Sequence, residues 1–118
     1  GLSYTNFNYS NLKISAKNNS AKVVLDIENI GDFDGADVVQ LYVRDLESSV
    51  DRPLKELKDF KKVILKKGEK KTIEFTLSEN AFAFWDEVSK DWKVEPGEFE
   101  ILIGKSSENI ILKKTIKI

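Results

Sequence analysis

Apolar and polar residues alternate along most of this chain with a period of two, and polar or glycine-containing turns separate the alternating stretches. The clearest stretch is K-V-V-L-D-I-E at residues 22–28, where Val23, Leu25 and Ile27 alternate with charged side chains. Successive side chains of a β-strand point to opposite faces, so this pattern predicts a strand with one buried face. No segment has a helical period over ten residues.

The same alternation recurs often enough to predict an all-β domain. Further strands are predicted over residues 7–14, 39–44, 60–65, 72–77, 82–85, 92–94, 98–103 and 110–118. About seven or more short strands at regular turn spacing are typical of an immunoglobulin-like antiparallel β-sandwich. The Cys–Trp–Cys pattern of true immunoglobulin domains is absent, which favours the fibronectin type III-like variant. We expect one domain over residues 1–118.

Local features predict where strands bend and turn. The apolar positions slip by one residue between Tyr9 and Leu12, which predicts a bulge. Asn29–Gly35 is rich in residues that tolerate positive φ, and Lys66–Glu69 contains a glycine, so we predict a turn at the first and a hairpin at the second. Asp45–Pro53 is predicted to be a polar loop, and residues 51–58 are expected to form a single helical turn at most.

Composition removes several classes of chemistry. The chain has no histidine and no cysteine, which excludes Ser–His and Cys–His catalysis, disulfides and thiolate-bound metals. Its net charge is -1, so it lacks the basic footprint of a nucleic-acid partner, and the lysine pairs are expected on a solvated sheet face or edge. No apolar run approaches the roughly 20 residues that span a bilayer. We therefore expect no cofactor, no nucleic acid and no membrane partner.

Two clusters of carboxylates are candidate sites. Asp32, Asp34 and Asp37 offer oxygen ligands for calcium, but their spacing does not follow the EF-hand pattern, and aspartate and glycine also suit a tight turn. We favour the turn.

Trp85 and Trp92 lie near Asp86, Glu87 and Asp91. They could stack on sugars, and the carboxylates could form a glycosidase pair. Trp92 alternates with Val94, however, so we favour a tryptophan in the core or in contact with another domain.

Four stretches, in order, resemble the fibronectin type III-like domain found near the C-terminus of glycoside hydrolase family 3 enzymes, chiefly β-glucosidases and β-xylosidases. G-L-S-Y-T-x-F at residues 1–7 is similar to the segment that leads into that domain. The others are N-x-G-D-x-x-G with V-V-Q-L-Y-V at 29–43, R-P-x-K-E-L-K-x-F at 52–60 and V-E-P-G-E-F at 94–99. Asp37 replaces a usual glutamate and Asp59 a common glycine.

The resemblance implies a parent enzyme that hydrolyses terminal β-linked sugars with retention, through an aspartate and a glutamate on other domains. Ser89–Trp92 is superficially similar to the family's S-D-W nucleophile motif, but its context is wrong and no catalytic role is transferred to it. The absence of an initial methionine leads us to expect a segment of a longer polypeptide. The sequence favours neither a cytoplasmic nor a secreted location.

Our first hypothesis is an accessory domain that packs on the catalytic domains of the same polypeptide and stabilises them. We expect the contact at the Ser48–Leu57 loop and at the leading segment Gly1–Phe7. The candidate contact residues combine cationic, anionic and rigid side chains: Tyr42, Arg44, Arg52, Pro53, Lys55 and Glu56. The alternative is a carbohydrate-binding or wall-anchoring module that uses Trp85 and Trp92 on a polysaccharide.

Overall fold

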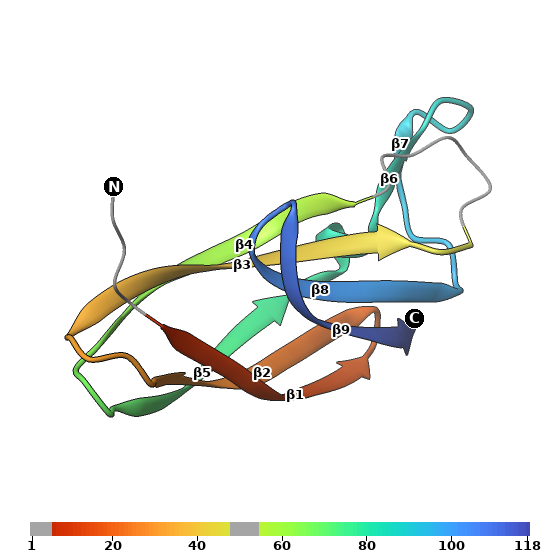
Figure 1. Cartoon of the computed structure of the whole chain (residues 1–118). Coiled ribbons are helices and arrows are strands. Elements are labelled where there is room, and N and C mark those ends of the chain that lie inside the picture. The colour runs from red at the N-terminus through yellow and green to blue at the C-terminus, as the bar shows by residue number, and fades with distance from the viewer. Residues whose placement is uncertain (1–5, 48–54) are drawn as a thin grey trace.

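The computed structural model describes residues 6–47 and 55–118, and it is a sandwich of two antiparallel sheets (Figure 1). One sheet has three strands in the order β1-β2-β5, and the other has four in the order β4-β3-β8-β9. A short hairpin, β6–β7, extends beyond one end of the sandwich. The elements are β1 (Phe7–Lys17), β2 (Ser20–Asn29), β3 (Gly35–Asp45), β4 (Glu56–Leu65), β5 (Lys70–Leu77), the 3₁₀ turn η1 (Glu79–Phe82), β6 (Phe84–Asp86), β7 (Asp91–Lys93), β8 (Glu98–Ser106) and β9 (Asn109–Lys117).

The prediction of an all-β antiparallel sandwich is confirmed. In the described part of the chain, seven strands form the two sheets and two more form the hairpin, for nine in total. Strand β4 begins at Glu56, so residues 56–58 are extended, where at most a helical turn was expected. No helix among residues 6–47 and 55–118 combines the length and apolar character that crossing a membrane requires.

The core lies between the two sheets and is built from the inward positions of the alternating pattern. Val23, Leu25 and Ile27 of β2 are fully buried, as the sequence predicts. Inward residues of β5, which lies beside β2 in the same sheet, and of β3 and β8 in the opposite sheet complete the core around them. Phe82 of η1 closes one end and contacts Phe99 edge to face, with ring centroids 5.1 Å apart. The single buried polar side chain among the described residues is Asn29.

The first strand carries the predicted bulge. Its pairing with β2 shifts register between Ser10 and Lys13, and Asn11 there has a φ of 55°. Asparagine tolerates this left-handed conformation better than most residues. Asn18 and Asn19, with φ values of 53° and 62°, form the two-residue turn between β1 and β2, as a type I′ turn requires.

The hairpin expected around Lys66–Glu69 does not form. Although Gly68 turns the chain with a φ of 78°, β4 pairs with β3 in one sheet and β5 pairs with β2 in the other. Both strands bury one face in the same core from opposite sides, so the turn crosses between the sheets. Lys61 of β4 connects the two sheets: its ammonium lies 5.4 Å from the ring centroid of Phe75 on β5 and donates a hydrogen bond to the carbonyl of Glu74.

Candidate functional site

The outward face of the four-stranded sheet holds two of the predicted contact residues. Val39, Leu41 and Val43 of β3 point into the core, so Tyr42 and Arg44 point away from it. The two side chains share this face with the residues directly opposite them on β4 and β8. The structure therefore brings Tyr42 and Arg44 together on one exposed side of the sandwich.

Tyr42 is buried although it lies outside the main core. Only 7% of its surface is exposed, and Leu102, its cross-strand partner on β8, is 2% exposed. Leu57 of β4 lies directly opposite Tyr42 on the other side. The Tyr42 hydroxyl donates a hydrogen bond to Oε1 of Gln40 on the same strand. This face of the sheet thus has an apolar centre of its own.

Arg44 is paired incompletely. It lies opposite Glu100, and its Nη1 is 3.6 Å from Oε1 of that carboxylate. The Arg44 Nε is buried and has no hydrogen-bond partner among the described residues. Buried donors are nearly always satisfied in folded proteins. The Arg44 guanidinium can therefore donate hydrogen bonds to a further anionic or carbonyl acceptor.

Apolar side chains on β4 and β3 extend this face outward. Phe60 and Ile64 of β4 are 63% and 65% exposed, and Leu57 and Val38 are 49% and 40% exposed. Phe60 lies opposite Gln40, and Ile64 lies opposite Ala36. A bulge at Leu41/Tyr42 leaves Lys58 as an extra residue and so returns Leu57 to the same side as Phe60.

The outward face of the three-stranded sheet is different in character, because charged and polar groups satisfy one another there. Asp26 accepts hydrogen bonds from Asn11 and Thr72, at 2.8 and 2.6 Å, and its Oδ2 lies 3.9 Å from the ammonium of Lys70. Such a surface is typical of a sheet face that contacts water.

The remaining contact candidates fall at the start of β4 or outside the described residues. Lys55 directly precedes β4, and Glu56 is its first residue. The Glu56 carboxylate lies 3.5 Å from the ammonium of Lys58. Arg52 and Pro53, together with the leading residues 1–5, lie outside the described part, so their predicted contacts remain predictions.

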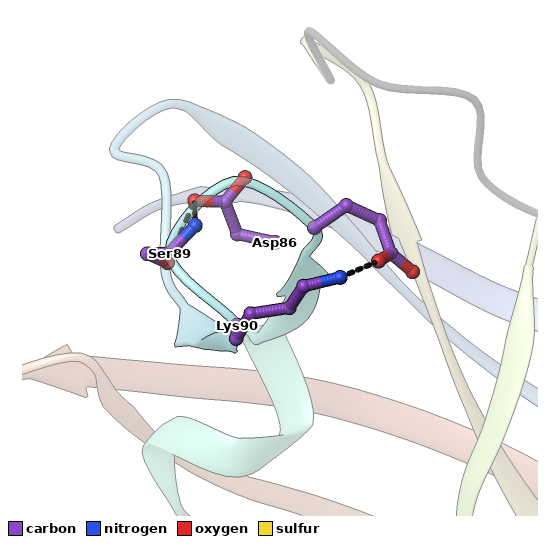
Figure 2. A network of polar contacts seen from close by, with 4 residues as sticks. Asp86, Ser89 and Lys90 are labelled. Carbon is purple, nitrogen blue, oxygen red and sulfur yellow. Dashed lines mark hydrogen bonds and ion pairs between the residues drawn. The ribbon is translucent and has the colours of Figure 1, made fainter.

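The second candidate region is the β6–β7 hairpin, whose turn is held by side-chain contacts (Figure 2). Asp86 accepts a hydrogen bond from the Ser89 hydroxyl at 2.7 Å, and Lys90 binds Glu87 at 3.0 Å. The Lys93 ammonium lies 3.0 Å from the Asp86 carboxylate. The hydrogen bond from Ser89 and the contact with Lys93 lower the pKa of Asp86 to about 2. The carboxylates of Asp86 and Glu87 thus stabilise the turn of the hairpin.

The two tryptophans of this hairpin lie directly opposite each other. Their ring centroids are 5.6 Å apart with an interplanar angle of 75°, so the rings meet edge to face and do not form one flat platform. Trp85 is 44% exposed and Trp92 is 63% exposed. Trp92 therefore does not lie in the core, which was one of its two expected positions: β7 belongs to the hairpin that extends beyond the sandwich, and Val94, beyond it, packs against the core. The expected contact of Trp92 with another domain stays a prediction.

A shallow hollow of about 220 Å³ adjoins Trp92. Asn19, Glu79 and Lys93 line it with polar groups. It lies where the β1–β2 turn and η1 approach the base of the hairpin. This hollow next to an exposed indole is the structural basis for the carbohydrate alternative.

Two of the three aspartates in and after the β2–β3 turn have separate structural partners, in agreement with the predicted turn. Asp34 accepts a hydrogen bond from the Lys67 amide at 2.8 Å, and Asp37 accepts one from the Tyr9 hydroxyl at 2.7 Å. The Asn29 side chain stabilises the same turn through hydrogen bonds with Phe33 and Gly31. Across residues 6–47 and 55–118, no group of three or more acidic, histidine or cysteine side chains is arranged to hold a metal ion.

Comparison with known proteins identifies the family. Residues 37–107 match the model of the fibronectin type III-like domain. The chain belongs to this family. The fibronectin type III-like domain therefore includes β3, the outward face described above and the tryptophan hairpin.

The relatives of this fibronectin type III-like chain are long enzymes. The thermostable β-glucosidase B of Acetivibrio thermocellus is 49% identical over all of this chain, which spans 16% of that protein. An exo-α-(1→6)-L-arabinopyranosidase of Bifidobacterium breve is 43% identical over 98% of the chain and 16% of its own length. The crystal structure of a Bifidobacterium adolescentis GH3 β-glucosidase superposes with a TM-score of 0.95 and 40% identity, over 100% of this chain and 18% of that one.

These comparisons confirm the resemblance to the fibronectin type III-like domain of family 3 glycoside hydrolases. The chain spans about one-sixth of the length of the curated relatives that it matches. Those relatives are named for different sugars, although the matched domain is similar in each. The domain is thus a shared part of enzymes that differ in substrate.

Proposed function

We propose that this chain is a non-catalytic accessory domain of a family 3 glycoside hydrolase of the β-glucosidase type. It packs on the catalytic domains of the same polypeptide and stabilises them. The supporting observation is that the whole chain aligns with only 16% and 18% of two β-glucosidases. Most of each enzyme thus lies outside the matched domain, and this remainder is long enough to hold the catalytic domains.

The residue content supports the same proposal. The chain has no histidine or cysteine, and Asp86 of the hairpin and Asp34 of the β2–β3 turn are engaged in local structure. Residues 1–118 form the domain, and residues 1–7 lead into it from a catalytic domain. The sequence similarity of 1–7 to the leading segment of the family supports this boundary.

The proposal is tested by the size and activity of the native protein. An antibody against this domain is used on extracts of the source cells, and the fractions are assayed for β-glucosidase. We expect a band several-fold heavier than 13.4 kDa that co-fractionates with the activity, and no activity from the 118-residue chain alone. A native band near 13.4 kDa would refute the accessory role.

The carbohydrate-binding alternative depends on the exposed Trp92 and the adjacent hollow. Retention of the isolated chain on insoluble glucan or xylan, lost on Trp92→Ala, would favour it. The edge-to-face arrangement of the indoles is poorly suited to a flat polysaccharide surface, which needs coplanar rings to stack on. We therefore expect no retention.

A further inference from the structure

We propose that the outward face of strands β4, β3 and β8 is the surface on which the rest of the polypeptide docks. We infer that the docked surface is apolar and presents a carboxylate to Arg44. The inference depends on the proposed accessory function, because it needs a longer chain to supply the partner. It specifies which side of the sandwich makes the contact.

The two outward faces of the sandwich differ in character. On the three-stranded sheet, Asp26 and its partners form a network of polar groups suited to water. On the four-stranded sheet, outward positions of β4 and β3 carry the exposed apolar side chains of Phe60, Ile64, Leu57 and Val38. A two-layer sandwich needs only its inner faces to be apolar. The second apolar face must therefore have a different partner.

The exposed apolar side chains of this face reach the edge of the sheet. Strand β4 is the outermost strand of the four-stranded sheet, and two of its large apolar side chains, Phe60 and Ile64, are about two-thirds exposed. An exposed apolar edge strand promotes aggregation unless another element covers it. Exposed apolar side chains gathered on one face mark interaction sites. Covering β4 would remove both side chains from water.

Arg44 lies at the other end of the same face. Its Nε is buried and lacks an acceptor among the described residues, while its Nη1 contact with Glu100 is long, at 3.6 Å. The Arg44 side chain is still 34% exposed, so a carboxylate on the docked surface would accept from two of its guanidinium N–H groups together, the paired geometry that arginine favours. The face thus combines an apolar area with a specific anionic contact.

Charge distinguishes the rest of the chain from a second copy as the occupant. Exposed Lys62 lies opposite Val38, and exposed Lys113 lies opposite Leu102, so cations border the apolar centre. A symmetric dimer would place the same patch against itself and bring these cations together. The relatives place this domain within chains about six times its length, so a covalently linked partner is always available.

The test uses thiol labelling, which suits a segment without cysteine. Phe60→Cys and Ile64→Cys are made in the 118-residue chain and in the intact polypeptide, and labelling at each site is followed by peptide mass spectrometry. Glu74→Cys, on the outward face of β5, is the matched control, because that side chain is 51% exposed. A docked thiol reacts only when the contact opens. We therefore expect the β4 thiols to label at least about tenfold more slowly in the intact polypeptide than in the 118-residue chain. The control thiol labels equally in both.

The other outcomes overturn the proposal in distinguishable ways. Equal labelling of Phe60→Cys in the free chain and in a heavier intact enzyme would refute docking at this face, while the accessory function would stand. Protection in the free chain that increases with its concentration would identify a second copy as the occupant. A native protein of only 13.4 kDa would refute both the docking and the accessory function.

Discussion

The hydroxyl of Tyr9 donates a 2.7 Å hydrogen bond to Oδ2 of Asp37 and so links the two sheets of the sandwich. Tyr9 lies on β1 and Asp37 lies on β3. The ammonium of Lys105, on β8, lies 3.4 Å from the same carboxylate oxygen and 5.7 Å from the centroid of the Tyr9 ring. Three strands are thus joined by polar contacts at one edge of the core.

Replacing Tyr9 by phenylalanine should destabilise the domain without changing its packing. The variant loses a hydrogen bond to a charged acceptor, which costs about 1 to 2 kcal/mol of unfolding free energy. Urea unfolding at neutral pH measures the loss. Tyr42→Phe is the matched control, because its hydroxyl bonds the neutral amide of Gln40 on its own strand. An equal loss from both variants would contradict a special role for the link between the sheets.

The same tyrosine predicts a loss of stability in alkali. Burial, the hydrogen bond to Asp37 and the charge of that carboxylate raise the pKa of Tyr9 far above the ordinary phenol value of 10.0. A group with a raised folded pKa contributes stability below its unfolded pKa, and this contribution falls as the pH rises above that value. The unfolding free energy should therefore decline above pH 10 less steeply in Tyr9→Phe than in the original chain. Parallel pH profiles would refute this prediction.

Asn29 should be the most sensitive polar position in the turn that precedes β3. Its side chain is fully buried, donates to the carbonyls of Phe33 and Leu65 and accepts from the Gly31 amide. Asn29→Ala leaves these groups unsatisfied, and we expect a loss of about 2 to 3 kcal/mol. The exposed Asn8→Ala is the control and should change the unfolding free energy by less than about 0.5 kcal/mol. Similar losses in denaturant unfolding would contradict the prediction.

Ser89 should control the acidity of Asp86 in the hairpin turn. The Ser89 hydroxyl is the main cause of the lowered pKa of Asp86, which lies at about 2 against an ordinary 3.8. Ser89→Ala should raise this pKa toward the ordinary value, as followed by NMR of the carboxyl carbon in acid. Glu87→Gln removes only the partner of Lys90 and should leave the pKa unchanged. Because the folded pKa is lowered, the stabilising contribution is present above pH 3.8 and is lost as the pH falls toward 2.

The indole pair should be visible by circular dichroism. Trp85 and Trp92 lie 5.6 Å apart and edge to face, a geometry that couples their electronic transitions. We expect a far-ultraviolet exciton couplet that either Trp85→Phe or Trp92→Phe abolishes, with the rest of the β spectrum unchanged. A spectrum without the couplet in the original chain would mean that the two strands of the hairpin do not hold this register.

The inward face of each long strand could be predicted, because the period of two assigns side chains to faces without knowledge of the partner strand. Val23, Leu25 and Ile27 are the clearest case. The bulge near Asn11 and the turn after Asn29 were also predictable, since both depend on local backbone preference. The positive-φ pair Asn18–Asn19 was an available signal for the first hairpin.

The sequence by itself determined the class of the domain, the alternation within its strands and the absence of histidine or thiol chemistry. Only the tertiary structure decided that β4 and β5 join different sheets, that Trp92 leaves the core, and that Tyr42 and Leu102 are buried on an outward face. The physical reason is that alternation defines two faces of a strand but not what lies against each. That choice depends on pairings between residues far apart in the chain, such as Tyr42 with Leu102 or Tyr9 with Asp37.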